Sequence, residues 1–142
     1  MRWICKGAIN EEEEQTLLQV GARKILLKKA ENPIILKILD IIGEHFDFEI
    51  SDNSYCRIEK RSQGHPWHCD TGSNNHMLWC KIGATMLISG DHTGGELSYK
   101  KEDGEVETIK NRQLYDLYFH TSDVEHKTED SIGDRTVFLL FI

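Results

Sequence analysis

The change in residue pattern near residue 43 constrains the fold of this chain more than any other feature of its 142 residues. Beyond it, short runs rich in β-branched and aromatic residues are separated by Gly, Asn, Asp and Ser, which favour turns. Asp103-Gly104, between two such runs, is typical of a hairpin turn. So many short strands predict a β-sandwich or barrel. The expected strands are residues 46–50, 55–60, 67–70, 77–88, 96–100, 106–110, 114–120 and 136–142.

The part of the chain before residue 46 is predicted to be helical. Asn10 followed by four glutamates is typical of an N-cap and an acidic first turn, and an apolar stripe continues from there toward a pair of lysines. Gly21 weakens the middle of this helix, so either one helix or two shorter pieces are expected. Asn32-Pro33 predicts the start of a second helix. We therefore expect an α+β chain that forms one domain over residues 1–142, with a helical part at about 10–45 and a β core at about 46–142.

Charge and composition limit the classes of partner. Acidic residues outnumber basic ones by 24 to 17, a net charge of −7, which weighs against a nucleic acid because its binding draws on Lys and Arg. No stretch approaches the roughly 20 apolar residues of a membrane helix, and the start lacks the apolar run of a secretory signal. We therefore expect a cytoplasmic protein without a membrane partner, whose four cysteines are reduced. Nothing in the sequence determines the oligomeric state.

His68-Cys69-Asp70 is the first part of a candidate metal site. Successive side chains of a strand point to opposite faces, so His68 and Asp70 can share one face while Cys69 points away. His126 lies fifty-six residues after Asp70, in another candidate strand, and would add a second imidazole. Two histidines and one carboxylate on one face of a metal leave positions open for a co-substrate and O₂, as in non-haem Fe(II) oxygenases.

Other residues are weighed against the same role. His45-Phe46-Asp47 repeats the H-x-D spacing, but it lies where the second helix ends, and a helix does not place positions two apart on one face. His120 is a spare histidine that we do not expect to be a ligand. His65 and Trp67 flank the candidate strand and could contact a substrate, although Trp67 could equally pack at the barrel mouth. Residues 70–75 are expected to form a mobile loop over the site.

Arg135 opens the final apolar run, nine positions after His126. An arginine that projects into an apolar interior needs an anionic partner, because an unpaired buried charge is costly. A guanidinium can hold a carboxylate through two hydrogen bonds, so Arg135 could bind the far end of a dicarboxylate whose near end chelates the metal. The alternative is a strand-start residue in a surface salt bridge. Thr85 and Thr136 are candidate hydroxyl donors to the carboxylate, or residues that simply favour a strand.

A set of these residues occurs in an order and with spacings that resemble a known family: Tyr55, Gly64, residues 67–72, Thr85, residues 94–97, His126, Gly133 and Arg135. Over about residues 54–142 the chain resembles the Fe(II)/2-oxoglutarate dioxygenases, and among them the compact prolyl 4-hydroxylase-type proteins. The resemblance implies a double-stranded β-helix, a jelly-roll or cupin-like distorted barrel, with the N-terminal helices packed on one sheet.

The resemblance also assigns roles to particular residues. It implies that the metal triad falls on His68, Asp70 and His126, and that the basic residue for oxoglutarate is Arg135. Relatives often have an aromatic hydroxyl that contacts oxoglutarate shortly before the H-x-D motif. Tyr55 is the candidate for it, although Arg57 shares its strand face, and Thr85 is a further candidate for cofactor binding.

The implied activity is hydroxylation of an unactivated C–H bond by an enzyme that uses Fe(II), 2-oxoglutarate as co-substrate and O₂, with ascorbate as a further candidate cofactor. The first candidate substrate is a prolyl or other side chain of a peptide or protein. A free amino acid comes second and a nucleobase third. Two alternatives stay open: a non-catalytic metal-binding β-barrel, and a cupin-like metalloenzyme that needs no oxoglutarate.

Overall fold

The structure is a computed structural model that describes residues 1–71 and 77–142. Most of the loop expected at residues 70–75 therefore lies outside the described residues. The helical elements are α1 (Glu11–Leu18), the 3₁₀ turn η1 (Leu27–Lys29) and α2 (Pro33–Gly43). The strands are β1 (Arg2–Cys5), β2 (Ile25–Leu26), β3 (Tyr55–Lys60), β4 (His65–His68), β5 (Ile82–Gly94), β6 (Leu97–Lys100), β7 (Val106–Ile109), β8 (Leu117–Thr121), β9 (His126–Thr128) and β10 (Ser131–Phe141).

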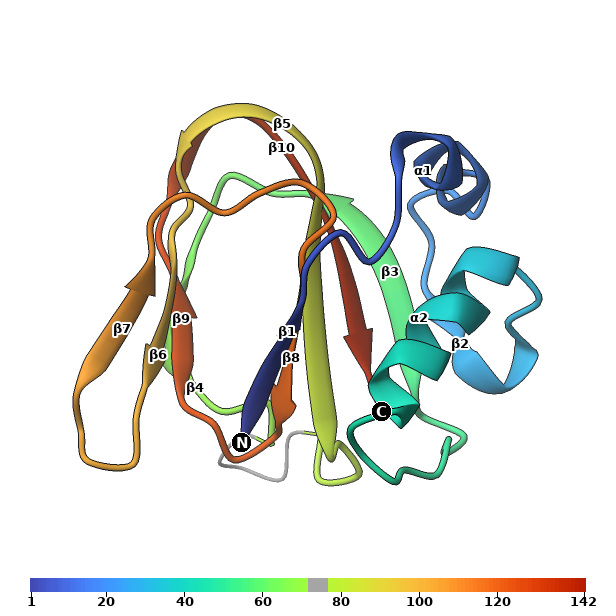
Figure 1. Cartoon of the computed structure of the whole chain (residues 1–142), viewed down its shortest axis with the longest axis horizontal. Helices are drawn as coiled ribbons and strands as arrows, with labels where there is room; N and C mark the ends of the chain where they lie inside the picture. Colours follow the sequence, from blue (N-terminus) through green and yellow to red (C-terminus); the bar gives the residue numbers. More distant parts are fainter. Residues whose placement is uncertain (72–76) are drawn as a thin grey trace.

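Two antiparallel sheets form the body of the molecule. The larger has the strand order β1-β8-β5-β10-β3-β2, and the smaller has the order β4-β9-β6-β7. Figure 1 shows the smaller sheet on one side of the larger and the helices α1 and α2 on the other. The expected α+β class, with helices packed on one sheet of a double-stranded β-helix, is confirmed.

The alternation of side chains along the larger sheet separates two environments. In β10, Phe138 and Leu140 belong to the core cluster shared with the helices, whereas Leu139 and Phe141 line a cavity on the opposite face, inside the barrel. A strand places neighbouring side chains on opposite faces, which explains this division. The helix α2 completes the core with aliphatic side chains, each of which contributes roughly 1.5–3 kcal/mol by burial. These are Ile34, Ile35, Ile38, Leu39 and Ile42.

The strands β5 and β10 pair along almost their whole lengths and connect the two ends of the barrel. Their register places Phe141 opposite Gly83 at one end and Ser131 opposite Gly94 at the other. It shifts by one residue between Thr136 and Val137. Figure 1 shows both strands curving over the same end of the barrel, so that this one pair borders the whole interior.

Local signals at the helix starts were read correctly. Asn10 caps α1 in a capping box with Glu13, and Asn32 caps α2, which has Pro33 at its start. The continuation of the first helix was wrong, because the chain leaves the helix after Leu18 and forms β2 and η1 instead. Gly21 adopts a φ of 71°, a left-handed conformation that an α-helix does not contain. None of the helices in the described ranges is long and apolar enough to cross a membrane.

The strand predictions were right for most of the barrel. The hairpin at Asp103-Gly104 is confirmed, with the Gly104 amide donating to the carbonyl of Lys101 at 2.9 Å and a φ of 87° at Gly104. Two strand predictions were wrong: residues 46–50 form no strand, and the strand expected at 77–88 begins only at Ile82. The short strand β1 was not predicted, because its few residues carry no alternation long enough to recognise.

Candidate metal centre

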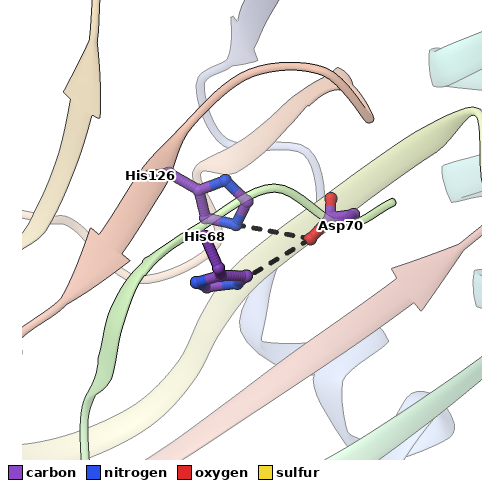
Figure 2. A group of neighbouring side chains, drawn as sticks. All are labelled: His68, Asp70 and His126. Carbon is purple, nitrogen blue, oxygen red and sulfur yellow. Dashed lines mark ion pairs between the residues drawn. The ribbon is translucent and has the colours of Figure 1, made fainter. Parts of the chain in front are cut away.

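His68, Asp70 and His126 lie together although they are distant in the sequence. His68 ends β4 and is paired with His126, the first residue of β9, while Asp70 follows just beyond β4. One ligand atom of each residue lies within 4.8 Å of the others. Nε2 of His126 is 3.4 Å and Nε2 of His68 is 4.0 Å from Oδ1 of Asp70, as the dashed lines in Figure 2 show.

The backbone fixes the orientation of both imidazoles. Nδ1 of His68 lies 2.7 Å from the carbonyl oxygen of Pro66, and Nδ1 of His126 lies 2.9 Å from that of Val124. A carbonyl only accepts hydrogen bonds, so each Nδ1 carries a proton, and in the neutral form of each ring the lone pair is on Nε2. Both lone pairs are then available to a metal, an arrangement that metal-binding histidines commonly show.

His120, which we did not expect to take part, holds the far side of the carboxylate. Its Nε2 lies 2.6 Å from Oδ2 of Asp70, and both residues are buried. Gly83 of β5 lies directly beneath, where a Cβ atom would collide with Oδ2 of Asp70. The carboxylate therefore has one oxygen held by His120 and the other directed toward the two outer histidines. The one feature of the sequence that could have indicated this role is the position of His120 at the end of the apolar run of β8.

Burial and neighbouring charges shift the pKa values of the ionisable groups at this centre. Burial alone would raise the pKa of Asp70, but hydrogen bonds and charges from His120 and His126 outweigh it and hold that pKa well below its usual value. Burial lowers the pKa of His120 despite the nearby carboxylate. Burial also acts against the charged form of His126, yet the hydrogen bond with Asp70 raises its pKa. Two imidazoles and an ionised carboxylate suit a divalent transition metal, so the residues present fit Fe(II).

A small cavity of about 80 Å³ adjoins the triad inside the barrel. His65 lines it, together with Thr85 of β5 and Phe141 of β10. Tyr55 lies beside this cavity, with its ring centroid 5.3 Å from that of Phe141 and the Lys24 ammonium 4.2 Å from its ring. Leu97, Leu139 and Phe141 form an apolar part of the cavity wall, opposite the polar groups of the triad.

Arg135 lies in β10 on the barrel side and is only 6% exposed. Its Nη1 donates to the carbonyl of Arg61 at 3.3 Å, and a Cβ on Gly95 would lie 2.9 Å from its Nε. Burial and the charge of Arg61 lower the pKa of this guanidinium. Arg135 lines a second, larger cavity of about 660 Å³. It is not among the residues that line the cavity beside the triad.

Arg112 was missed by the sequence analysis, because Asn111-Arg112-Gln113 reads as a polar connection between strands. Its guanidinium enters the barrel, where Nη2 donates to Oγ1 of Thr85 at 2.8 Å and Cζ lies 5.4 Å from the centroid of the Tyr118 ring. Arg112 lines the same larger cavity as Arg135. Thr85 therefore connects the triad cavity with this second arginine.

Trp67 points away from the triad. The ammonium groups of Lys100 and Lys127 lie 5.0 and 5.2 Å from its ring centroid, which is within the range of cation–π attraction. Of the two roles considered for Trp67, packing on the smaller sheet agrees with these contacts.

The chain matches known proteins in its fold but not in its sequence. No protein-family model and no curated protein sequence matches the chain. Solved structures do match it, over 99% of its length. A prolyl-4-hydroxylase of Pseudomonas putida superposes with a TM-score of 0.70 at 14% identity, and the match covers 83% of that chain. The chain has the fold of the 2-oxoglutarate–Fe(II) oxygenases.

Two further structures with this oxygenase fold extend the comparison. An oxidoreductase of the 2-oxoglutarate–Fe(II) oxygenase family from Burkholderia pseudomallei has a TM-score of 0.65 at 12% identity, with 82% of that chain covered. A prolyl hydroxylase from Trichoplax adhaerens, in complex with a peptide fragment of a hypoxia-inducible factor, has a TM-score of 0.67 at 11% identity, with 83% covered.

Proposed function

We propose that this chain is an Fe(II)- and 2-oxoglutarate-dependent dioxygenase that hydroxylates an unactivated C–H bond, and that residues 1–142 act as one catalytic domain. His68, Asp70 and His126 are the proposed metal ligands. The observation that carries the proposal is their convergence, with the Nδ1 atoms of both histidines held by backbone carbonyls and their Nε2 atoms left for a metal. The oxygenase fold supports it independently.

Each part of the site has a task in this proposal. Bound iron and O₂ would supply oxidation of the C–H bond coupled to decarboxylation of 2-oxoglutarate to succinate and CO₂. Asp70 and the two histidines would hold the metal from one side, which would leave its other positions for the co-substrate and O₂. His120 keeps the carboxylate oriented. Leu139 and Phe141 form an apolar part of the cavity wall. Arg135, Thr85 and Tyr55 are proposed for the co-substrate.

The proposed substrate is a prolyl or other side chain of a peptide or protein. Support comes from two structures with the same fold, a bacterial prolyl-4-hydroxylase and a prolyl hydroxylase in complex with a peptide fragment. A free amino acid and a nucleobase are the other outcomes of a substrate screen. In such a screen, incubation with peptide, amino-acid and nucleic-acid pools is followed by mass spectrometry for the gain of one oxygen atom. Ascorbate dependence and the cytoplasmic location stay predictions.

The central experiment measures succinate formation with Fe(II), 2-oxoglutarate and O₂, and 2-oxoglutarate binding to the Fe(II) protein without O₂. Asp70→Asn should abolish both. Asp47→Asn is the matched control, because Asp47 belongs to the other H-x-D sequence, is exposed and lies outside the site. Metal binding without any oxoglutarate binding would contradict the proposal and favour the non-catalytic barrel. Turnover that survives Arg135→Gln and needs no oxoglutarate would favour the cupin-like alternative.

A further inference from the structure

Arg112 has a buried guanidinium that forms no ion pair within residues 1–71 and 77–142. Its backbone lies in the connection between β7 and β8, whereas its Nε is sealed from solvent and has no hydrogen-bond partner. Its one side-chain hydrogen bond goes to the neutral hydroxyl of Thr85. In the described part of the chain, the arginines that form ion pairs are Arg2, Arg57 and Arg61. A buried cation without an anion is costly, so its retention here calls for a ligand.

The charge of Arg112 is not alone in this space. Arg135 lines the same cavity, and its guanidinium also has no ion pair among residues 1–71 and 77–142. Burial, with the charge of Arg135 added, lowers the pKa of Arg112 to about 10. Arg112 thus stays protonated near neutral pH. Asp91 and Glu96 also line the cavity, but in the described part of the chain neither forms an ion pair with either guanidinium.

The position of Arg112 relative to the triad matches the length of a five-carbon dicarboxylate. Thr85, which accepts a hydrogen bond from Arg112, lies two residues along β5 from Gly83. Because Gly83 underlies Asp70, Thr85 lies about 7 Å along the strand from the level of Asp70. A metal–ligand bond spans roughly 2 Å, and an extended five-carbon chain spans on the order of 5 Å. A molecule that chelates at the triad would therefore bring its far carboxylate to the level of Thr85.

Arg135 lies farther along the strand pair. It is paired with Gly90, five residues beyond Thr85 on β5, and its guanidinium is held against the Arg61 carbonyl and the backbone of Gly95. Arg112, in contrast, contacts a residue that lines the triad cavity itself. Neither guanidinium lines the triad cavity itself, but that of Arg112 contacts one of its lining residues, Thr85.

We propose that Arg112, together with Thr85, makes the first contact with the distal carboxylate of the oxo-acid co-substrate, and that Arg135 is the second cation behind it. This inference rests on the proposed function. The guanidinium offers a planar fork of donors that matches a carboxylate. Thr85 accepts from Arg112 and so keeps its own hydroxyl proton to donate to the same carboxylate. The two cations make the site selective for a dicarboxylic over a monocarboxylic oxo acid.

The test compares two ligands that differ only in the distal group. Calorimetry on the Ni(II)-loaded full chain measures the affinities for 2-oxoglutarate and for 2-oxopentanoate, which has a methyl group in place of the distal carboxylate. Arg112→Gln should weaken 2-oxoglutarate binding about 10- to 100-fold, as expected for hydrogen bonds to a charged group, and leave 2-oxopentanoate binding little changed. Arg135→Gln should show a smaller loss. Lys101→Gln, at an exposed cation in the connection between β6 and β7 that lines neither cavity, is the matched control and should bind both ligands like the wild type.

A second variant separates a binding role from a structural one. Arg112→Met keeps an unbranched apolar stem and removes the uncompensated charge, so its melting temperature without oxo acid should equal or exceed that of the wild type. A fall of several degrees would show that Arg112 supports the fold, and would overturn the inference.

The remaining outcomes are equally decisive. Wild-type affinity in Arg112→Gln, an equal loss for both ligands, or a larger loss in Arg135→Gln would each remove Arg112 from the first contact while the proposed function stands. If the Ni(II)-loaded wild type binds no 2-oxoglutarate, the proposed function fails and the inference fails with it.

Discussion

At one end of the barrel interior, the Asp70 carboxylate is surrounded by the imidazoles of His68, His120 and His126. At the other end, the guanidiniums of Arg112 and Arg135 line a cavity, and neither forms an ion pair in the described part of the chain. The first arrangement satisfies its buried charge with groups of the chain itself. The second leaves its charge for a ligand. Internal partners hold a side chain in place before binding, while an unbalanced charge strengthens binding once an anion arrives.

The largest effect that would break this comparison is expected at Asp70. In Asp70→Ala the metal loses one of three ligands, which should weaken Ni(II) or Fe(II) binding by about 3–4 kcal/mol, roughly 100- to 1000-fold. Calorimetry measures the affinity directly. In the wild type, free metal at 1000 times its dissociation constant should raise the unfolding free energy by about 4 kcal/mol. An equal thermal shift in Asp70→Ala would show that the metal binds elsewhere.

His120 tests whether the metal end depends on its internal partner. His120→Phe removes the donor to Oδ2 of Asp70, and a lost partner of a metal ligand typically weakens the metal about 10- to 100-fold. His45→Phe, at an exposed histidine just beyond α2 whose ring lies against Trp3, serves as the control histidine. Unchanged metal affinity in His120→Phe would mean that the hydrogen bond to Asp70 contributes nothing to ligand orientation.

Two glycines allow the two ends to be perturbed separately. In Gly83→Ala the new Cβ meets Asp70, so we expect weaker metal binding and a stability loss of about 1–3 kcal/mol, as for overpacking. In Gly95→Ala the residue has a φ of 75° and faces Arg135, so oxo-acid binding should weaken while metal affinity is retained. Urea unfolding and calorimetry would distinguish the two variants. Identical profiles would show that the ends are not independent.

Thr85 carries the smallest expected effect. Thr85→Val removes the acceptor of Arg112 and the hydroxyl proposed for the co-substrate, which should weaken 2-oxoglutarate about 2- to 10-fold without changing metal affinity. Thr108→Val, which removes a hydroxyl from β7 in the smaller sheet, is a matched control and should leave both affinities as they are. A parallel loss of metal affinity in Thr85→Val would contradict the separation of the two ends.

The sequence predicted the meeting of the triad because strand periodicity is a local property. His68 ends β4 and Asp70 lies two residues later, so the two positions were expected on one face. His126 begins β9, which is distant in the sequence but pairs with β4 in the smaller sheet. Strand periodicity could not predict which residues surround the Asp70 carboxylate. His120 and Gly83 come from β8 and β5, and their approach to Asp70 depends on how three strands pack.

The arginine end was less predictable, for a physical reason. Arg135 lies in a strand, so its side-chain direction follows from alternation. Arg112 lies in a connection, where no periodicity determines which way a side chain points, and its neighbours are polar. The first helix failed similarly: its apolar pattern continued past Leu18, but the left-handed backbone at Gly21 ended the helix.

The shift of register between Thr136 and Val137 gives β5 one residue more than β10, so that Gly90 and not Ser89 stands opposite Arg135. Deleting a single residue of β5 at this point would restore an even count and turn the segment beyond it inside out, since strand faces alternate with period two. The stretch before it, with Gly83 and Thr85, would keep its faces. The number of residues in β5, independently of any side chain, thus sets the spacing between the His-Asp-His cluster and the arginine end of the barrel.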